Sequence, residues 1–436
     1  MNDSAAKRAR RTRTAGRLAG AGLLLAAGVL LWRGPLSVPA EPYDFTQVYV
    51  ATRAWLAGGD VYDLATRRAV WREAPGTTGS RRDAEALTAL YPPGLYPLLG
   101  PAAALPFPWA VRAWTAVGGL SVVALVVAGW RLAGVRPASI RGLALAAALC
   151  LLAPIQTNFR LGQLGLPATA LVMLGLWAGW SGRRWAVSGL VLGLAVGLKP
   201  QLSLPFVLYV LLRGGWREAG VAVAVAAGLT GLGAARLWLA GVDWPTGLAA
   251  ELAAFTDGGH GDPMPANPHR WQMIDLAPLT HLAIEHRGVA AAVVWGLVAG
   301  LAAAAWLAVP RRGDRPTELT VLGLVAALSL LVVYHRFYDA VLLALPVCAL
   351  LCGWRRRHRI VAILAVGLLL PFAVNLPAAV RVFGGRVGWV SGLVESPFGR
   401  WVALPVYTWC LLGLALLAVG VLSRRRGAER GADDGP

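Results

Sequence analysis

The sequence predicts an all-α polytopic membrane protein with about twelve transmembrane helices. Hydrophobic residues make up 57% of the 436-residue chain and charged residues only 14%. A soluble domain carries about 25% charged residues. Apolar runs recur along nearly the whole length, and many approach or exceed the ~17–20 residues that span a bilayer. The basic residues gather in short clusters between these runs, so a single soluble core is excluded.

These basic clusters predict how the chain crosses the membrane, because loops on the cytoplasmic side carry an excess of Lys and Arg. If every cluster is cytoplasmic, each adjacent pair must be joined by an even number of crossings. The net charge of +19 then reflects membrane orientation, and no nucleic-acid partner is expected. The clusters are Lys7–Arg17, Arg131–Arg141, Arg183–Arg184, Arg213–Arg217, Arg311–Arg315, Arg355–Arg359 and Arg424–Arg426.

Twelve crossings satisfy this rule and place both termini inside. In chain order the predicted spans are residues 16–33, 109–130, 142–157, 164–182, 186–198, 201–213, 218–240, 288–309, 317–334, 338–353, 360–377 and 402–423. The outer connections are then about 34–108, 158–163, 199–200, 241–287, 335–337 and 378–401. The composition of the connection 241–287 supports its outer location, because it contains six acidic residues and only two basic ones, Arg270 and Arg287.

The chain divides into a cytoplasmic basic tail at 1–15, a single transmembrane domain at 16–423 and a polar tail at 424–436 that we expect to be disordered. The outer connections 34–108 and 241–287 are expected to form a cap. Residues 91–107 are rich in proline, which costs about 3 kcal/mol inside a helix. We therefore expect an interfacial or re-entrant segment there, packed on protein.

Two spans, 186–198 and 201–213, are shorter than the ~17 residues that a crossing needs. The turn between them, at Lys199 and Pro200, is expected to lie below the outer surface. Irregular backbone at that depth is tolerated only where it lines a cavity or is buried in protein. Short, proline-interrupted spans are typical of binding sites in membrane proteins. Lys199 is one of only two lysines in the chain, and it lies in an apolar run.

Unusual polar residues fall on the outer side of this topology, in segments far apart in the sequence. We expect them to converge on one cavity at the membrane boundary. They are Asp44 in "YDFTQVY", Arg160 and Gln163 in "NFRLGQLG", Lys199 in "LKPQ", and His335, Arg336 and Asp339 in "YHRFYD".

Most of these side chains also have a purely structural interpretation. Asp44 can cap an interfacial helix that begins near Phe45, since aspartate is a favoured N-cap. Arg160 and Arg336 can be span-end residues whose charged heads reach the interface. Asp339 can pair with Arg336, which lies three residues before it on one helix.

Gln163 can join two helices by a hydrogen bond, and His335 can be a satisfied polar group in a loop. Lys199 is the hardest to explain in this way, because a charge in an apolar setting is costly and usually marks a functional pathway. Lysine is also a compact point charge that binds phosphate. A cavity with one carboxylate and several cations at membrane depth fits a lipid phosphate, and the carboxylate can act as a general base toward a hydroxyl.

Aromatic residues in the first outer connection offer a second kind of contact. Trp55, Tyr62, Trp71 and Tyr91 can stack on sugar faces. The alternative is that they are interfacial anchors, which is a common use of Trp and Tyr at membrane boundaries.

All four cysteines lie in apolar runs, and we expect them to be small core residues. Cys348 and Cys352 have helical spacing, but no nearby His or Cys completes a zinc set. We therefore expect no metal and no other cofactor. The remaining cysteines are Cys150 and Cys410.

Taken in order, these motifs resemble glycosyltransferase family 87, the polyprenyl-phosphate-dependent enzymes of the GT-C type. The resemblance rests on "YDFTQVYVATRAWLAGGDVYD", "YPP", "NFRLGQLG", "GLKP" and "YHRFYD", and it extends over about residues 40–350. It implies a GT-C fold with an active site on the outer face of the plasma membrane. It also implies a sugar donor carried on polyprenyl phosphate and a glycolipid or glycan acceptor, with membrane lipids as surroundings.

Carried over by motif, Asp44 matches the catalytic aspartate of the family, Lys199 the lysine near the donor phosphate and Gln163 the glutamine of the Gly-Gln pair. The resemblance implies inverting transfer with Asp44 as general base, and Lys199 helped by Arg160 or Arg336 on the leaving phosphate. Tyr91 belongs to the matching "YPP" motif and is a candidate substrate contact.

The last motif departs from the family pattern, because mannosyltransferase members often have adjacent histidines there. Either His335 or Asp339 can be the equivalent active-site residue. The donor sugar therefore stays open between mannose, which we favour, and a pentose such as arabinofuranose.

Two rival functions come from other classes. Twelve spans with both termini inside is also typical of a transporter or lipid flippase, but the two halves of this chain do not resemble each other. The coupling residues of a transporter lie near the midplane, whereas these polar residues lie on one side. A non-catalytic membrane scaffold leaves that one-sided cluster unexplained.

Overall fold

The computed structural model describes residues 3–74, 87–180, 184–267, 269–309, 313–353, 359–375 and 396–433. Over these residues the chain is helical, and the only strand-like pairing is an isolated bridge between Met273 and Arg336. Most of the expected outer connection 378–401 lies outside the described residues, as do Arg183, Arg311, Arg312 and the arginines at 355–357.

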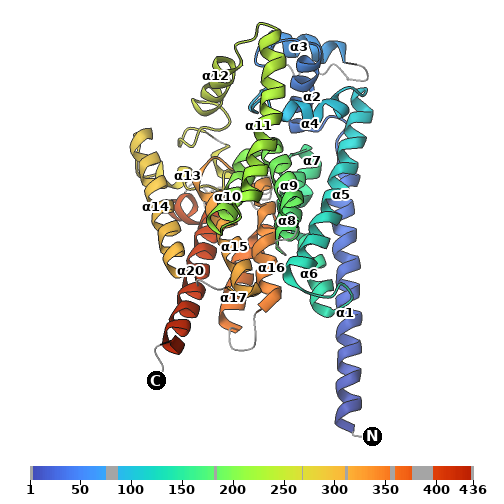
Figure 1. Ribbon diagram of the computed structural model, residues 1–436, viewed down its shortest axis with the longest axis vertical. Helices are drawn as coiled ribbons and strands as arrows, with labels where there is room; N and C mark the ends of the chain where they lie inside the picture. Colours follow the sequence, from blue (N-terminus) through green and yellow to red (C-terminus); the bar gives the residue numbers. More distant parts are fainter. Residues whose placement is uncertain are drawn as a thin grey trace.

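Six described helices are long and apolar enough to cross a bilayer, judged by length and composition. Their number confirms a polytopic membrane protein. Both chain ends lie at the lower end of the molecule (Figure 1). The six helices are α1 (Asp3–Arg33), α5 (Phe107–Ala133), α11 (Trp216–Leu239), α14 (Arg287–Ala308), α15 (Arg315–Val332) and α20 (Val406–Asp433).

The other predicted spans coincide with a bent pair of helices and with shorter apolar ones. The pair bends by 45° at Leu152, the residue between the two helices. Pro154 lies in the first turn of the second helix, where proline removes no helical hydrogen bond. The pair is α6 (Ile140–Leu151) and α7 (Ala153–Leu161). The short elements are α8 (Gly165–Gly179), α9 (Trp185–Leu198), α10 (Pro200–Leu212), η4 (Phe337–Leu343) leading into α16 (Ala344–Gly353), and α17 (Arg359–Leu369) leading into η6 (Leu370–Ala373).

Each of the twelve predicted crossings falls on one of these helical segments. The C-terminal tail differs from expectation, because α20 continues to Asp433 through residues that we expected to be disordered. At the other end, α1 begins at Asp3, within the basic tail. A helix extends past an apolar span readily once its first turns are formed, since propagation is much easier than nucleation.

Most helices within the two long connections lie toward the end of the molecule opposite both termini, whereas one of them, α13 (Ala277–Thr280), lies lower, beside α14 (Figure 1). The sequence predicts a cap there, with an interfacial helix near Phe45 as one interpretation of Asp44 and an interfacial or re-entrant segment at 91–107, but not the other elements. The first connection holds η1 (Pro35–Ser37), α2 (Tyr43–Leu56), α3 (Leu64–Glu73) and α4 (Leu95–Ala103), and the second holds α12 (Trp244–Thr256), η3 (Arg270–Gln272) and α13 (Ala277–Thr280).

A buried ion pair joins the two connections. Arg67 of α3 donates to Glu251 of α12 at 2.6 Å, and the other carboxylate oxygen of Glu251 accepts from the backbone N–H of Ala89 at 3.1 Å. Arg67 is buried and also donates to the carbonyl of Val61 at 2.8 Å. Because a buried charge is stable only when paired, this contact holds α3, α12 and the segment before Tyr91 together.

The position of α9 depends on small residues that face α11. Gly189, Gly193 and Gly197 recur every four residues, which places them on one helix face. A Cβ built on Gly193 would come within 2.6 Å of the Cβ of Val225, so a larger residue would push the helices apart. Small residues allow close backbone approach between membrane helices. This packing fixes the end of α9, where Lys199 follows.

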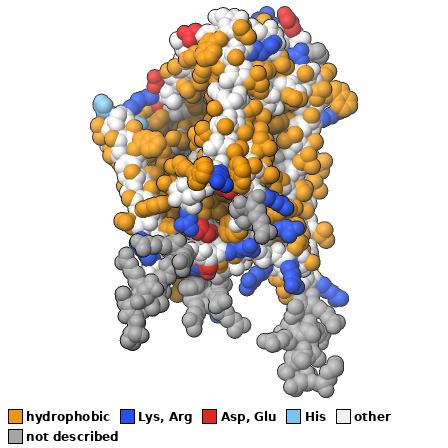
Figure 2. Space-filling model, in the orientation of Figure 1, with side chains coloured by type: hydrophobic (Ala, Val, Ile, Leu, Met, Phe, Trp, Pro, Cys, Tyr) orange, Lys and Arg blue, Asp and Glu red, His pale blue; other side chains and the backbone are white. Residues whose placement is uncertain are grey.

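One face of the molecule is largely covered by apolar side chains (Figure 2). Charged side chains interrupt this surface mainly near its lower part and at the top. Exposed large apolar residues such as Leu208, Trp295 and Trp306 lie on helices α10 and α14. An apolar belt between two more polar ends is the surface that a bilayer requires.

Candidate active site

Lys199 lies in the break between α9 and α10, as the sequence predicts. Its backbone (φ −153°, ψ 85°) is not helical, and its N–H ends α9 by donating to the carbonyl of Ala195 at 2.9 Å. Pro200 then occupies the first position of α10, where its missing N–H costs nothing. Lys199 is only 2% exposed, so this break is buried in protein.

The ammonium of Lys199 forms an ion pair with Asp339. The Nζ–Oδ1 distance is 2.5 Å, and Asp339 is also only 2% exposed. The Nζ of Lys199 also donates to the side-chain carbonyl of Gln163 at 3.3 Å and lies 4.9 Å from the centre of the Tyr338 ring. The structural alternative that paired Asp339 with Arg336 is therefore not the arrangement found.

The second oxygen of Asp339 is held by His335, with Nδ1 3.0 Å from Oδ2. His335 is fully buried, and its Nε2 has no hydrogen-bond partner among the described residues. Two residues that we had not singled out support this turn. Asp275 accepts from the backbone N–H of His335 at 3.2 Å, and Asn158 donates to the carbonyl of Tyr338 at 2.8 Å.

Asp275 and Asn158 each had a weak signal in the sequence. Asn158 opens the same "NFRLGQ" motif that contains Gln163, and Asp275 is one of the acids of the second connection. Burial raises the pKa of Asp275 to about 6, although backbone N–H groups of His335 and Ala277 oppose the shift. Both residues shape the turn at 335–339 and do not open to the surface.

Asp44 lies in the first turn of α2, which begins at Tyr43 with Pro42 as its N-cap. Asp44 is therefore not the N-cap, contrary to the structural alternative. The side chain is half-buried and hydrogen-bonds the side chain of Gln163. Burial raises the pKa of Asp44, while the Gln163 hydrogen bond and the charges of Arg336 and Lys199 oppose that rise.

Gln163 thus links Asp44 to Lys199, because its side-chain carbonyl accepts from Lys199 while the side chain also hydrogen-bonds Asp44. The preceding residue makes this possible. Gly162 ends α7 with φ +68°, a conformation that glycine adopts without strain. A Cβ on Gly162 would lie 2.4 Å from the Cβ of Phe45, so glycine also allows α2 to approach α7.

Arg336 is the partly exposed cation of the site. Its Nη2 donates to the carbonyl of His260 at 3.0 Å, and the guanidinium lies 5.7 Å from the Tyr334 ring centre. Its Nε has no hydrogen-bond partner in the described part of the chain. The charge of Arg336 lowers the pKa of Asp44, which places the two groups within electrostatic reach.

Tyr91 and Arg160 occupy different surroundings. Tyr91 lies near Asp44 and Asp339, because both charges contribute to the raised pKa of its hydroxyl after burial itself. Its carbonyl accepts from the hydroxyl of Tyr62 at 3.0 Å, so the cap holds it in place. Arg160 is exposed in the last turn of α7, and over the described residues it makes no hydrogen bond or ion pair with this cluster.

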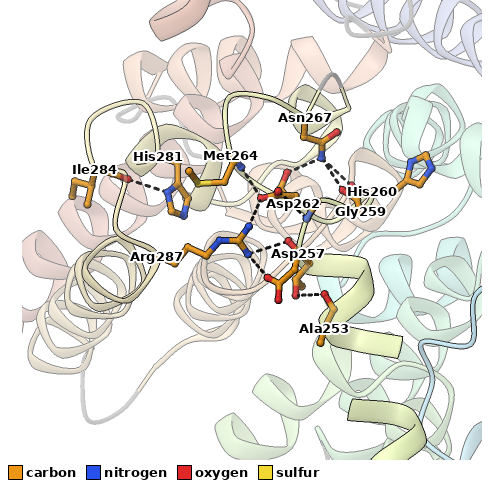
Figure 3. A network of polar contacts seen from close by, with 12 residues as sticks. Ala253, Asp257, Gly259, His260, Asp262, Met264, Asn267, His281, Ile284 and Arg287 are labelled. Carbon is orange, nitrogen blue, oxygen red and sulfur yellow. Dashed lines mark hydrogen bonds and ion pairs between the residues drawn. The ribbon is translucent and has the colours of Figure 1, made fainter. Parts of the chain in front are cut away.

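The second connection contains a compact polar network around Arg287 and Asp262 (Figure 3). Arg287 pairs with Asp257 and, at 3.2 Å, with Asp262. Asp262 also accepts from the backbone N–H groups of Gly258 and Met264, each at 3.0 Å.

This network directs the loop toward the turn at 335–339. Asn267 donates to the carbonyl of Asp262 at 2.6 Å, and the fold of the loop leaves the carbonyl of His260 facing Arg336. The N–H of Ile274 donates to the carbonyl of His335 at 2.9 Å. Residues from the second connection therefore position both His335 and Arg336.

The other sequence expectations can also be placed. The four cysteines are unpaired thiols, three of them buried and Cys352 half-buried. Within the described ranges, no group of three or more His, Cys, Asp or Glu residues is arranged to hold a metal ion. Trp55, Tyr62 and Trp71 are buried in the cap, so they do not present open faces for stacking.

The site can accept a proton and hold an anion at the same place. Both oxygens of Asp339 are engaged, whereas Asp44 is half-buried and accepts from one amide. Asp44 is thus the accessible carboxylate, and Arg336 is the cation with an N–H to spare.

Comparison with known protein families gives one match. The model of glycosyltransferase family 87 matches residues 89–334, which is more than half of the chain. The matched region includes Tyr91, Gln163 and Lys199, but begins after Asp44 and ends immediately before His335. No curated protein and no solved structure matches the chain significantly.

Proposed function

Because the chain belongs to glycosyltransferase family 87 and is a membrane glycosyltransferase, we propose that it transfers mannose from a polyprenyl-phosphate donor to a lipid-linked or cell-envelope glycan. The observation that carries this proposal is the polar chain Asp44–Gln163–Lys199, with Arg336 beside Asp44. This proposal takes Asp44 as a base and Lys199 and Arg336 as cations, brought together from separate segments of the chain.

Asp44 acts as the general base. An acceptor hydroxyl oxygen attacks the anomeric carbon of the donor sugar, and its proton passes to the carboxylate of Asp44. The bond from the anomeric carbon to the phosphate oxygen breaks, and polyprenyl phosphate leaves with the electron pair. The leaving group is already an anion and needs no acid, so one carboxylate suffices, unlike the pair used in glycoside hydrolysis. The configuration at the anomeric carbon inverts.

Arg336 is the better contact for the leaving phosphate, because Lys199 is already paired with Asp339. Arginine binds phosphate oxygens through several N–H donors, and Arg336 keeps its Nε–H without a partner. Lys199 acts from the next layer, where its charge also favours an anion nearby. Asp339 and His335 are positioning residues in this scheme, since they hold Lys199 and do not face the donor.

A donor with a long apolar tail is supported by a groove of about 750 Å³ between α10, α14 and α15. One end of the groove lies at Pro200 and Gln201, which follow Lys199 directly. A polyprenyl chain in that groove would leave its phosphate near the polar cluster. The GT-C type, the twelve crossings and the plasma-membrane location with an outer-face site belong to this proposal, and the basic clusters at the termini support the orientation.

The donor can be identified with the purified full-length protein in detergent. Polyprenyl-phosphate-mannose and polyprenyl-phosphate-arabinose are supplied separately, and acceptor lipids are analysed by mass spectrometry. We expect a mass gain of one hexose from the first donor only. A pentose gain would instead establish the arabinofuranosyltransferase alternative, which the single histidine in "YHRFYD" leaves open. Transfer from neither donor, with the Asp44→Asn variant equally inactive, would contradict the proposal.

The pH dependence of transfer should report the contact between Arg336 and Asp44. A general base acts when ionised, so the rate should fall as the pH drops through the raised pKa of Asp44. The Arg336→Gln variant removes a charge that lowers this pKa, so the acid limb of the kcat/KM profile should move to higher pH. Arg112→Gln is the matched control, because Arg112 is exposed and stacks on Trp109. If the acid limb of Arg336→Gln did not move, the charge of Arg336 would not act on the carboxylate of Asp44.

A further inference from the structure

A second polar cavity lies at the end of the helices away from Asp44. Its volume is about 450 Å³, within the range of small-molecule sites. It is formed by the last turns of α8 and α10, the first turns of α9, α11 and α15, and nearby loop residues. Figure 2 shows oppositely charged side chains together in the lower part of the apolar face. The charged residues lining the cavity are Arg213, Glu218, Arg315 and Glu318.

Two of these charges are satisfied by each other. Glu318 accepts from the hydroxyl of Tyr209 at 2.6 Å and pairs with Arg213. This arrangement neutralises one wall of the cavity and fixes Tyr209 and Arg213 at its edge.

The other two charges have no ionic partner among the described residues. Glu218, in the first turn of α11, is half-buried and makes no hydrogen bond or ion pair there. The guanidinium of Arg315 lies 5.7 Å from the centre of the Trp180 ring and forms no ion pair. Within the described ranges, the cavity thus presents one carboxylate and one guanidinium that lack an ionic partner.

The complement of this pair is a small group that carries both charges. A primary ammonium offers three N–H donors to a carboxylate, and a phosphate accepts from a guanidinium. A phosphoethanolamine headgroup has both. A quaternary ammonium has no N–H donor, and a glycerol headgroup has no positive charge, so neither would satisfy Glu218 as well.

The cavity is continuous with the apolar groove, because Tyr209 and Arg213 line both. The groove follows α10 from Arg213 to Pro200, a length of about 20 Å at ~1.5 Å per residue. One leaflet accounts for about 15 Å of a ~30 Å hydrocarbon core. The groove is therefore longer than one leaflet, and the end at Arg213 can take an acyl chain while the end at Pro200 serves the donor tail.

We propose that this cavity binds the phosphoethanolamine headgroup of a membrane phospholipid, with an acyl chain in the adjoining end of the groove. Glu218 contacts the ammonium and Arg315 the phosphate. The site belongs to the leaflet at the end of the molecule that carries both termini. The inference is independent of the transfer reaction, because none of its residues belongs to the cluster around Asp44.

Native mass spectrometry of the delipidated full-length protein tests the proposal. The protein is titrated with phosphatidylethanolamine, phosphatidylglycerol and phosphatidylcholine of identical acyl chains. We expect one molecule of phosphatidylethanolamine to bind about 10-fold or more tightly than either of the others, since a hydrogen bond to a charged group contributes about 1.5–3 kcal/mol. Equal affinity for the three lipids would overturn the proposal without any variant.

Two variants assign the contacts. Glu218→Gln should abolish the preference for phosphatidylethanolamine over phosphatidylglycerol, and Arg315→Gln should weaken the binding of all three lipids. Arg217→Gln is the matched control, because Arg217 is exposed beside Glu218 and stacks on Trp216 without lining the cavity. A preference that survives Glu218→Gln would contradict the proposed ammonium contact.

Discussion

Replacing Asp44 with Asn should reduce sugar transfer by about 10²–10⁴-fold, the usual contribution of a positioned general base. Asn keeps the size of the side chain and can still hydrogen-bond Gln163, but it cannot take the proton of the acceptor hydroxyl. Asp339 cannot replace it, because its two oxygens are held by Lys199 and His335. The loss should appear in kcat, measured with saturating donor and acceptor.

The fold should survive this substitution. Burial raises the pKa of Asp44, which means that the ionised carboxylate is less stable in the folded protein than in water. Removing its charge should leave the Tm unchanged or slightly higher. Glu285→Gln is the matched control, since Glu285 is an exposed carboxylate of the second connection, and its turnover should stay normal. Near-normal turnover of a folded Asp44→Asn variant would show that Asp44 is not the base.

The sequence predicted the positions of the apolar helices well, because the signals for them are local, although only six of these helices are long enough to cross a bilayer alone. Apolar length and arginine clusters placed a helix at every predicted crossing. The break at Lys199 and Pro200 also followed from local evidence, namely two runs too short to cross and a proline between them. In contrast, α2, α3 and α12 are short helices of 14, 10 and 13 residues. Their positions depend on tertiary contacts such as Arg67 with Glu251, which no local pattern reveals.

The members of the site were harder to predict than its location. Arg160 and Gln163 lie three residues apart in one motif, yet the first is exposed and the second is buried against Lys199. The difference arises at Gly162, whose left-handed conformation ends α7 and turns the chain before Gln163. Sequence spacing alone would have kept the two side chains on one helix face.

The ion-pair partner of Lys199 could not be predicted from the sequence either. Asp339 lies 140 residues away along the chain, and the local rule offered Arg336 as its partner instead. The packing of η4 beside α8 turns Asp339 inward and leaves Arg336 toward His260. Because of the buried pair, our proposal places Lys199 one layer behind the phosphate and not in direct contact with it.

Replacing Lys199 with Met should destabilise the protein strongly as well as impair transfer. The substitution leaves the carboxylate of Asp339 buried without its cation, and removing one partner of a buried ion pair costs about 3–5 kcal/mol. The Tm should therefore fall, and transfer should fall with it. This single variant cannot separate a role in folding from a role toward the donor.

The double variant Lys199→Met with Asp339→Asn makes that separation. It removes both charges, so most of the lost Tm should return, while Asn can still hydrogen-bond His335. If the charge of Lys199 acts on the donor phosphate, the stable double variant should still show a donor KM raised about 10-fold or more, since contacts to charged groups contribute about 1.5–3 kcal/mol. Asp339→Asn alone also breaks the buried pair and should lower the Tm, but it keeps the ammonium, so the folded protein should retain a normal donor KM. A double variant with normal Tm and normal donor KM would restrict Lys199 to a structural role and leave Arg336 as the cation that serves the phosphate.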